Sequence, residues 1–408
     1  MSTKNQSTET HSMENTLPLA GIKVIDLSRV LAGPFCGMTL ANLGAEVIKV
    51  EDKKGDETRM WGPFTKDMSD SFMALNFNKR GIVANLKTPE GAEVIRQLAA
   101  GADVLVENFK TGDMEKFGLG YDTLAEANPG LVYTSIAAFG RKGPRANFPG
   151  YETLLQAYSG IMSFTGTPGG EPVRTGVSFL DLTSGLSAAL ATVVALYRRK
   201  ETGLGGKVEG SLLQSALGLM LVQLVPYLNN GKLPAKLGSG HASATPYQAF
   251  KTADGWVLIA AANQNLWERL ARATGLEWMI GEDRFADNPA RMAHLEEFLG
   301  HLNAAFGQWE TAKLVDTCVG AGVPCSPIND LDALMADGQV DALEPFIGLD
   351  DPDYGHIRTS NVPFHLTDFG SREIIRPPRL GEHTREVLAE LGYGEAAIDA
   401  LYEKGAVA

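Results

Sequence analysis

The chain has 408 residues, 44% of them hydrophobic, and a formal net charge of −13 at pH 7. A chain of this length exceeds the usual size of a single domain, so we expect one large domain and a smaller one. The negative charge argues against nonspecific binding to nucleic acid or to anionic membranes, although a local basic patch can still bind an anionic ligand.

Cysteine, histidine and hydropathy patterns narrow the class further. Cys36, Cys318 and Cys325 lack the CxxC spacing, and the seven histidines lack the HxxxH and HExxH patterns. We therefore expect a reducing compartment, no disulfide framework and no metal. Residues 1–16 are polar and lack the apolar core of a secretory signal, which predicts a disordered tail. No apolar run reaches the length of a membrane span, and we expect a cytoplasmic protein.

The first part of the chain alternates strand and helix patterns. Thr88 and Gly101 are typical residues for the start and the end of a helix. In chain order we expect a strand over 22–27, a helix from Pro34 to Gly44, a strand over 46–51, a strand over 81–87, a helix over 88–101, and strands over 102–109 and 130–140. This alternation predicts a doubly wound, Rossmann-like α/β sheet.

A long apolar helix follows within "VSFLDLTSGLSAALATVVALYRRKETGLGGKV", residues 177–208, with Gly203 supplying its C-cap. The next stretch, 206–228, predicts a strand and then one helix. We expect the first part of the large domain over 17–225, a smaller α+β domain over 226–330, and a return to the large domain over 331–408 with a helix near its end.

Dinucleotide binding is one interpretation of the first strand–helix–strand unit. Glu51 ends the second strand, where an acidic side chain can bind a ribose. However, the turn "SRVLAGPFCG" lacks the G-x-G-x-x-G fingerprint, and it has Pro34 where such a loop needs an approachable backbone. The sequence therefore disfavours binding of NAD.

Two basic turns follow strand patterns. Lys79 and Arg80 lie in "NFNKRG", and Lys110 and Lys116 lie in "ENFKTGDMEKFG". Such residues are often solvated surface charges, but lysine and arginine also match phosphate oxygens in charge and geometry. Because ligands of open α/β sheets gather at the carboxyl ends of strands, phosphate binding is the alternative.

Asp181 stands at the start of the long helix, beside Thr183 and Ser184. One interpretation is a helix cap, whose carboxylate the positive helix end keeps ionised. The other is a nucleophile, because an ionised and positioned carboxylate can attack an activated acyl group. The residues alone do not choose between these roles.

Several ordered motifs together resemble a known family. They are "PLAGIKVIDLSRVLAGPFCGMTLANLGAEVIKVE", "NKRGIVANLKTPEG", "ADVLVENF", "GLGYDTLAEANPGLVYTSIAAFG", "PGYETLLQAYSGIMSFTG", "VSFLDLTSGLSAA", "ALYRRKETGLGGKVEGSLLQSAL" and "PPRLGEHTREVLAELGY". From about Leu17 to the C-terminus the chain is similar to class III coenzyme A transferases, the family of formyl-CoA transferase, carnitine CoA-transferase and α-methylacyl-CoA racemase. The resemblance implies an intertwined homodimer that binds CoA, with acyl-CoA as a substrate and no permanently bound cofactor.

The resemblance also assigns site residues. Asp181 falls on the nucleophilic aspartate of the transferases, and Tyr151 falls on a position beside the pantetheine end of CoA. The further positions implied to contact CoA are Val30, Leu31, Ala32, Leu75, Asn76, Phe77, Asn78, Lys79, Arg80, Asn108, Phe109, Lys110 and Lys116. The racemase branch resembles this chain less, since it has a histidine where this chain has Tyr151.

The loop "GSGHASATPYQAF" and the preceding "GTPGGEPVRTGVSFLDL" look most like the succinyl-CoA:glutarate branch. Acetyl-CoA:oxalate and formyl-CoA:oxalate exchange are the alternatives; a dehydrogenase or a noncatalytic CoA-binding subunit fits the residues less well. We expect the backbone N–H groups of Gly238, Ser239 and Gly240 to stabilise oxyanions. Arg174 and His241 are the candidates for binding the distal carboxylate of a dicarboxylic substrate.

Overall fold

The computed structural model describes residues 16–408, so that nearly all of the predicted tail lies outside the described residues. The chain divides into two compact units. The first contains the chain up to Ser159, Thr175–Leu224 and Pro345–Ala408, and the second contains Gly160–Arg174 and Val225–Glu344. The second unit thus runs beyond the expected small domain at its C-terminal end and takes in a short segment that precedes Asp181.

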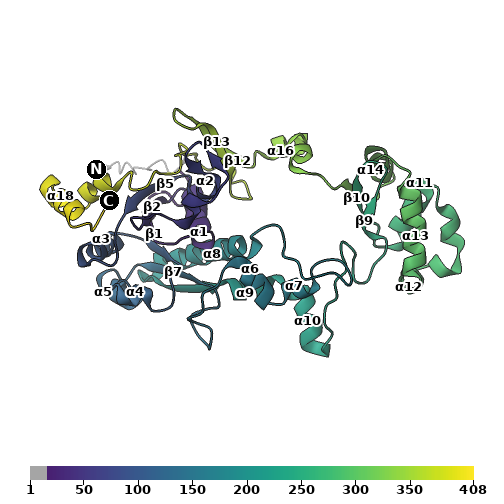
Figure 1. Ribbon diagram of the computed structural model, residues 1–408, viewed down its shortest axis with the longest axis horizontal. Helices are drawn as coiled ribbons and strands as arrows, with labels where there is room; N and C mark the ends of the chain where they lie inside the picture. Colours follow the sequence, from purple (N-terminus) through teal and green to yellow (C-terminus); the bar gives the residue numbers. More distant parts are fainter. Residues whose placement is uncertain (1–15) are drawn as a thin grey trace, which may run out of the picture. The chain divides into compact units, whose positions relative to one another are not determined.

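A six-stranded parallel sheet forms the centre of the first unit (Figure 1). Its strand order is β5-β2-β1-β6-β7-β8, which is the order of a doubly wound sheet and confirms the expected fold class. The strands are β1 (Lys23–Asp26), β2 (Glu46–Glu51), β5 (Lys79–Val83), β6 (Val104–Glu107), β7 (Val132–Ala137) and β8 (Gly206–Ser211).

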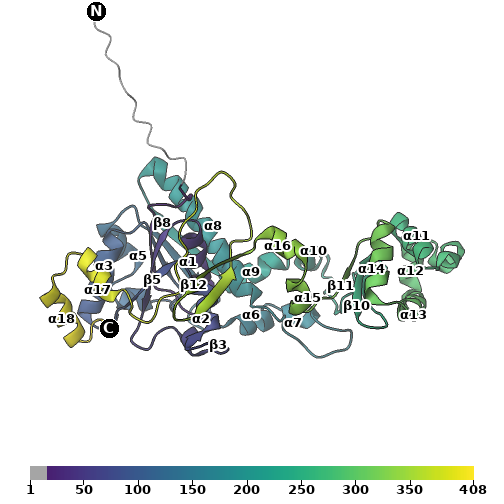
Figure 2. The same ribbon diagram turned by 90° about the horizontal axis from the view of Figure 1, so that it is seen from above.

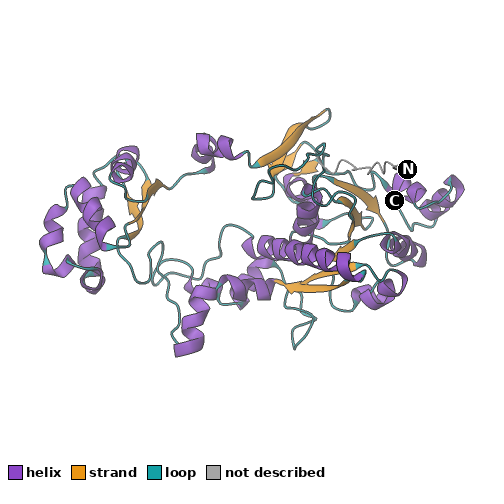
Figure 3. Ribbon diagram, turned by 180° about the vertical axis from the view of Figure 1, so that it is seen from behind, coloured by secondary structure: helices purple, strands orange, loops and turns teal. Residues whose placement is uncertain are grey.

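Helices cover both faces of this sheet (Figure 3). Because successive side chains of a strand point to opposite faces, each strand divides its residues between two layers. Ile25 and Leu105 join the core beneath one set of helices, whereas Thr134 of β7 bonds to a helix on the other face. The helices of the first face are α3 (Pro89–Ala100), α4 (Asp113–Lys116), α5 (Tyr121–Ala127), α17 (Thr384–Glu390) and α18 (Glu395–Glu403).

The opposite face carries α1 (Ala32–Asn42) and α8 (Phe179–Thr202), which pack closely on each other. Gly185 of α8 makes this approach possible, because a Cβ there would lie 2.4 Å from the carbonyl oxygen of Ala32. The α6 helix (Glu152–Tyr158) and the α9 helix (Leu212–Leu219) pack beside α8. The start of α8 is therefore surrounded by elements from three separate stretches of the chain.

The residues at several helix ends predicted those ends correctly. Thr88 caps α3, since its hydroxyl accepts a hydrogen bond from the Gly91 N–H, and Gly101 follows as the C-cap. Gly203 ends α8 in the left-handed conformation, with φ of 69°. The single helix expected over 211–228 is instead two helices, α9 and α10 (Leu221–Asn230), with Met220 between them. Gly218 weakens helix propensity just before this break.

The α8 helix contradicts the expectation that no apolar run in the chain reaches the length of a membrane span. Among the described residues it is long and apolar enough to cross a membrane by length and composition, and α9 with α10 would pass only as one bent pair. Leu180, Ala188 and Leu196 are nevertheless buried inside the first unit. This pattern is typical of the core helix of an α/β layer.

The last part of the chain completes the first unit. The β12 strand (Phe346–Asp351) and the β13 strand (Gly355–Ser360) form an antiparallel ribbon, and β3 (Phe64–Thr65) pairs with β4 (Met68–Ser69). The α2 helix (Asp70–Asn76) lies against β13, where Met73, Phe77 and Ile357 share a small core. Ala84 meets Val407 in an isolated bridge, so that the C-terminus closes on the sheet edge beside β5.

The second unit has a three-stranded antiparallel sheet and helices packed against it (Figure 2). Trp267, Phe298 and Phe306 are fully buried in its core. The strands are β9 (Tyr247–Lys251), β10 (Trp256–Ala260) and β11 (Cys325–Pro327), and the helices are α7 (Ile161–Phe164), α11 (Gln264–Ala273), α12 (Asn288–Ala293), α13 (Leu295–Phe306), α14 (Thr311–Gly320), α15 (Leu331–Met335) and α16 (Gly338–Leu343). The expected smaller α+β architecture is thus present.

Candidate active site

Asp181 is the third residue of α8, and its side chain is inside the first turn rather than at the cap. The N-cap residue is Ser178, which makes no side-chain capping hydrogen bond. Asp181 is only 8% exposed. Because the cap position belongs to another residue, the capping interpretation does not account for a carboxyl group buried here.

The surroundings of Asp181 make its charged form costly. Burial raises its pKa to about 7, and the neighbouring carboxylate of Glu152 adds to the rise. The positive end of a helix favours a carboxylate, but by an amount that falls off within the first turn. The expectation that the helix keeps Asp181 ionised is therefore wrong as stated: near neutral pH, the carboxyl group is poised between its two protonation states.

Glu152 is the first residue of α6 and is itself 6% exposed. Its Oε1 accepts a hydrogen bond of 2.6 Å from the Gln156 Nε2, whereas its Oε2 has no hydrogen-bond partner among the described residues. The fully buried Gln156 also bonds to Thr175, accepting from its backbone N–H and donating to its hydroxyl, each at 3.0 Å. This network ties α6 to the segment that enters α8.

The turn between β1 and α1 has an unusual backbone conformation at Val30. Its φ is 67°, in the left-handed region that a β-branched residue rarely adopts. The carboxylate of Asp56 accepts the Val30 N–H at 3.2 and 3.3 Å and also pairs with Lys49 at 3.0 Å. Lys49 in turn donates to the Ser28 carbonyl oxygen at 3.0 Å. A buried ion pair from the neighbouring strand thus holds the turn in a strained form, which is a feature of functional sites.

A second buried ion pair, between Lys79 and Asp26, contacts the same turn. The Lys79 ammonium lies 2.9 Å from Asp26 and also donates to Asn76 and to the Pro34 carbonyl oxygen. Lys79 is therefore not a solvated surface charge. Arg80 pairs with Glu386 and Glu390, both at the surface of α17. The expected basic turn is wrong at these two positions, since Lys79 and Arg80 are the first residues of β5, and both side chains pair with protein groups.

The remaining positions implied to contact CoA are distributed along the first unit. The side-chain amide of Asn108 accepts a hydrogen bond from the Arg29 N–H at 2.8 Å and donates one to the Arg29 carbonyl oxygen at 2.7 Å. These two bonds join the end of β6 to the turn after β1. Leu75, Phe77 and Asn78 are buried at the end of α2. Leu31 and Ala32 begin α1, and the Phe109 ring lies beneath the Arg29 guanidinium. Lys116 pairs with Asp113 at the surface. Tyr151, at the start of α6, is 59% exposed.

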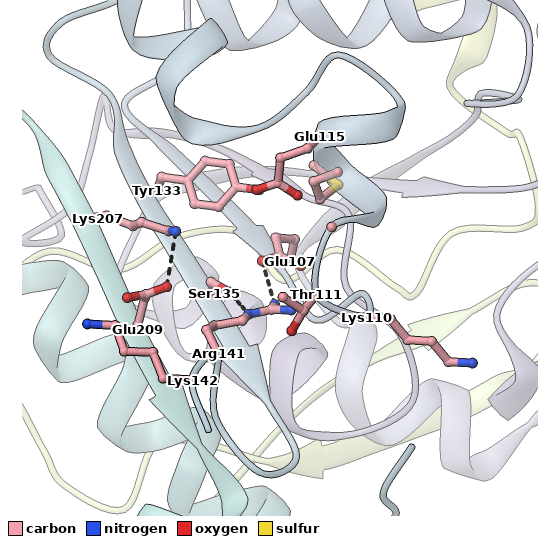
Figure 4. A pocket seen from close by; sticks show the side chains of 12 residues that line it. Glu107, Lys110, Thr111, Glu115, Tyr133, Ser135, Arg141, Lys142, Lys207 and Glu209 are labelled. Atoms are coloured by element: carbon pink, nitrogen blue, oxygen red, sulfur yellow. Dashed lines mark hydrogen bonds and ion pairs between the residues drawn. The ribbon is translucent and has the colours of Figure 1, made fainter. Parts of the chain in front are cut away.

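One pocket of the first unit lies on the α4 and α5 face of the sheet and has a volume of about 260 Å³ (Figure 4). Arg141 crosses it, donating to Glu107 and Ser135 at 2.7 and 2.8 Å. Lys207 and Glu209 of β8 pair at 3.0 Å on its wall. Lys110 also lines this pocket, so one residue implied to bind CoA lies on the face opposite to α8.

The second unit contains the other proposed site residues. The Gly238 N–H donates to Gly166 and the Gly240 N–H donates to Leu237, each at 2.9 Å, whereas the Ser239 hydroxyl accepts from the Ala249 N–H. Two of the three expected oxyanion donors are thus already hydrogen-bonded within the unit. His241 stacks on Tyr247 at 5.2 Å, and Arg174 is exposed.

Sequence reasoning missed the groups that support the site. Glu152 directly follows Tyr151, but nothing in "PGYE" shows that its carboxylate is buried beside Asp181. Asp56 and Lys49 look like ordinary surface charges in the sequence and are both buried. Gln156 is the one residue with a readable signal, because it is four positions after Glu152 on the same helix.

Comparison with known proteins places this geometry in a family. A family model described as CoA-transferase family III matches residues 19–384. The chain is 39% identical over 382 residues to the succinate–glutarate CoA-transferase of Agrobacterium fabrum, covering 92% of this chain and 96% of the relative. It is 38% identical over 393 residues to the succinyl-CoA:glutarate CoA-transferase of Mus musculus, covering 96% of this chain and 90% of the relative.

A solved structure agrees with these matches. The crystal structure of a CaiB/BaiF family protein from Brucella suis superposes with a TM-score of 0.84 at 38% identity, covering 92% of this chain and 100% of the other. The sequence resemblance is thereby confirmed at the level of family and fold. The chain belongs to CoA-transferase family III, and it is a CoA-transferase that uses acyl-CoA as a substrate.

Proposed function

We propose that this enzyme moves CoA from succinyl-CoA to a free dicarboxylic acid such as glutarate, with Asp181 as the nucleophile. The observation that carries the proposal is the burial of Asp181 in the first turn of α8, in a chain that belongs to a family of CoA-transferases. The relatives named above as glutarate CoA-transferases support the choice of substrates. Oxalate is the alternative acceptor.

Covalent catalysis divides a difficult exchange into easier steps. An Asp181 carboxylate oxygen forms a bond to the thioester carbonyl carbon, the carbonyl electron pair moves to oxygen, and collapse breaks the C–S bond. This step gives a mixed anhydride and CoA thiolate. The thiolate then attacks the Asp181 carbonyl carbon and releases the donor acid, leaving an aspartyl-CoA thioester. The acceptor carboxylate repeats the two steps in reverse.

Burial of Asp181 contributes to this chemistry. A carboxylate taken out of water is less solvated and more basic, so its attack on a carbonyl carbon costs less desolvation in the transition state. The same burial keeps part of the enzyme protonated at neutral pH, since the pKa of Asp181 is raised to about 7. The expected result is a rate that rises with pH as Asp181 ionises.

The turn held by Asp56 supports binding of CoA. The backbone N–H groups of Leu31 and Ala32 lie next to each other at the start of α1, whereas the Val30 N–H is bonded to Asp56 and Pro34 has no N–H to add. Backbone N–H groups at a helix start can bind a carbonyl oxygen or an anion without any charged side chain. Lys110 and Lys116 remain the candidates for phosphate contacts.

The distal carboxylate of a dicarboxylic substrate needs a cationic partner. Arg174 is exposed, and His241 is exposed at the loop that follows Leu237. We expect Arg174→Ala to raise KM for glutarate by about tenfold, the scale of one charge-assisted hydrogen bond, with little change for a monocarboxylate of similar length. An equal change for both acids would assign Arg174 no part in acceptor selection.

A second copy of the chain is the proposed partner. α8 exposes an apolar stripe, in which Leu190 is 66% and Tyr197 is 70% exposed, with Leu186 and Val194 on the same side. These positions recur at helical spacing, so they share one face of the helix. Light scattering tests the homodimer: the wild type should have twice the mass of one chain, and Leu190→Lys should lower this mass.

The direct test of the proposed activity is an exchange assay. The enzyme is incubated with succinyl-CoA and one acceptor at a time, and the new acyl-CoA is measured by mass spectrometry. Formation of glutaryl-CoA that Asp181→Asn abolishes is the expected result. Glutarate turnover by Asp181→Asn would contradict the role of Asp181, and exchange with oxalate alone would favour the alternative acceptor.

A further inference from the structure

The carboxyl groups of Asp181 and Glu152 are both buried where two helices of the first unit pack together. They belong to different helices, α8 and α6, which pack against each other, and their residues are 8% and 6% exposed. Among residues 16–408, neither side chain takes part in an ion pair, and Glu152 Oε2 is buried without a hydrogen-bond partner. Two uncompensated negative charges in such a place are strongly unfavourable, so the pair tends to keep a proton.

The other charged groups nearby do not relieve this pair. α1 and α9 contain no Asp, Glu, Lys or Arg, and the Cys36 thiol of α1 stays neutral because burial raises its pKa. Lys207 and Glu209 of β8 pair with each other. Within the part of the chain that the structure describes, Glu152 is the charged group that acts on Asp181.

Gln156 fixes the orientation of Glu152. The Thr175 N–H donates to the Gln156 Oε1, so the side-chain amide cannot flip without losing this bond. Its Nε2 therefore faces the Glu152 Oε1, which must act as an acceptor.

We propose that the charge of Glu152 keeps a proton on Asp181 in the free enzyme, and that this proton is released when Asp181 becomes acylated. The inference rests on the proposed function, because it needs an acylated Asp181. Glu152 is a positioning residue in this scheme, since it acts on the nucleophile through its charge. Gln156 holds it in place.

The proton balance follows from the chemistry of the exchange. A carboxylate and a thioester give a thioester and a carboxylate, with no proton taken up or released. When the enzyme starts with one proton on Asp181, forming the neutral aspartyl-CoA thioester removes the charge repulsion that retained it. Each acylated subunit then releases up to one proton to solvent.

The experiment measures acylation and proton release on the same sample. Wild-type enzyme is mixed with excess succinyl-CoA without acceptor in weak buffer; a pH indicator reports protons, and mass spectrometry of the intact chain reports CoA on Asp181. With a pKa of about 7, we expect release of about 0.9 proton per acylated subunit at pH 6, about 0.5 at pH 7 and about 0.1 at pH 8.

Two variants separate Glu152 from a general effect of charge. Glu152→Gln removes the like charge and retains the shape, so the midpoint of proton release should move down by about one pH unit. Glu93→Gln is the matched control, because Glu93 also accepts from a glutamine four residues later, Gln97, but on the exposed side of α3. The control should leave the release curve of the wild type unchanged.

The possible outcomes distinguish this inference from the proposed function. If no acyl-CoA donor modifies Asp181, the proposed function fails, and this inference fails with it because it needs an acylated Asp181. If Asp181 is acylated without proton release at pH 6, or with a release that Glu152→Gln leaves unchanged, this inference is overturned while the nucleophile stands.

An Asp181 raised to the same pKa by burial alone would give the same wild-type curve, so the decision rests on changes at Glu152. Should Glu152→Gln not fold, Gln156→Leu removes the donor to the Glu152 Oε1 and should move the midpoint of proton release up; an unchanged midpoint would overturn the inference.

Discussion

The hydroxyl groups of Thr134 in β7 and Thr192 in α8 lie 2.6 Å apart and join the helix that carries Asp181 to the centre of the sheet. Both hydroxyls are fully buried. Because neighbouring residues of a strand point to opposite faces, Tyr133 and Ser135 must face away from α8. The pocket that they line is therefore separated from Asp181 by the sheet.

This separation predicts that the pocket can be damaged without affecting Asp181 chemistry. Arg141→Ala leaves the buried Glu107 without its cation, and the first unit should lose about 3 kcal/mol of stability. The reactivity of Asp181 in the folded fraction should not change. Thermal unfolding and single-turnover acylation on the same samples measure the two effects.

A control variant removes a cation of the same kind from the surface. Arg96 pairs with Glu93 on α3, where both side chains are partly exposed, so Arg96→Ala should cost less than about 1 kcal/mol. Loss of acylation in folded Arg141→Ala would mean that the pocket communicates with the nucleophile through the sheet.

Asp181 should lower the stability of the protein at neutral pH. Its folded-state pKa, about 7, is above the value of 3.8 for an unperturbed aspartate, so the folded chain holds a proton that the unfolded chain has lost. Stability from this group is complete below about pH 4 and is lost as pH rises towards 7. Asn is always neutral, so Asp181→Asn should be more stable than the wild type. This difference in the free energy of unfolding should grow by about 3 kcal/mol from about pH 5 to about pH 8.

Unfolding curves of the two proteins across this pH range measure that gain. Asp113→Asn is a suitable control because Asp113 pairs with Lys116 at the surface. A difference between wild type and Asp181→Asn that stays constant with pH would show that the carboxyl group of Asp181 titrates normally.

The buried pair of Asp56 and Lys49 should show strong coupling in a double-mutant cycle. Asp56→Asn leaves Lys49 charged and unpaired in a site where it is fully buried, which should cost about 3 to 5 kcal/mol. Lys49→Met together with Asp56→Asn should recover much of this loss, because no unpaired charge remains. Additive effects of the two substitutions would contradict the ion pair.

The same cycle reports on the turn at Val30. The Asp56 carboxylate is the acceptor that holds the Val30 N–H, and an amide is a weaker acceptor than a carboxylate. The double variant should therefore be stable but bind acyl-CoA several-fold more weakly. If it binds acyl-CoA as the wild type does, the strained turn has no part in binding.

The α/β class of the sheet and several helix ends could be predicted because they depend on local signals. Strand–helix alternation, Thr88 at the start of α3 and Gly203 at the end of α8 are readable in a few neighbouring residues. Asp181 was found because it stands in a motif shared with a family. Its position inside the first turn, and not at the cap, depends on where Ser178 begins the helix.

The surroundings of Asp181 could not be predicted in this way. Glu152 reaches Asp181 only because α6 packs on α8, and the two residues are far apart in the sequence. Lys79 looked like a surface charge beside Arg80, and its burial follows from Asp26 on a strand more than fifty residues earlier. Long-range pairings of this kind leave no local signal, so they become visible only in the folded chain.

The central claim is that Asp181 forms a covalent bond during CoA transfer. Hydroxylamine added to enzyme and succinyl-CoA converts an aspartyl anhydride or thioester into a hydroxamate, which peptide mass spectrometry locates. The account predicts a hydroxamate on Asp181 that is absent without acyl-CoA and more abundant at pH 8 than at pH 6, since the nucleophile ionises near about pH 7. An unmodified Asp181 in enzyme that still exchanges CoA would contradict it.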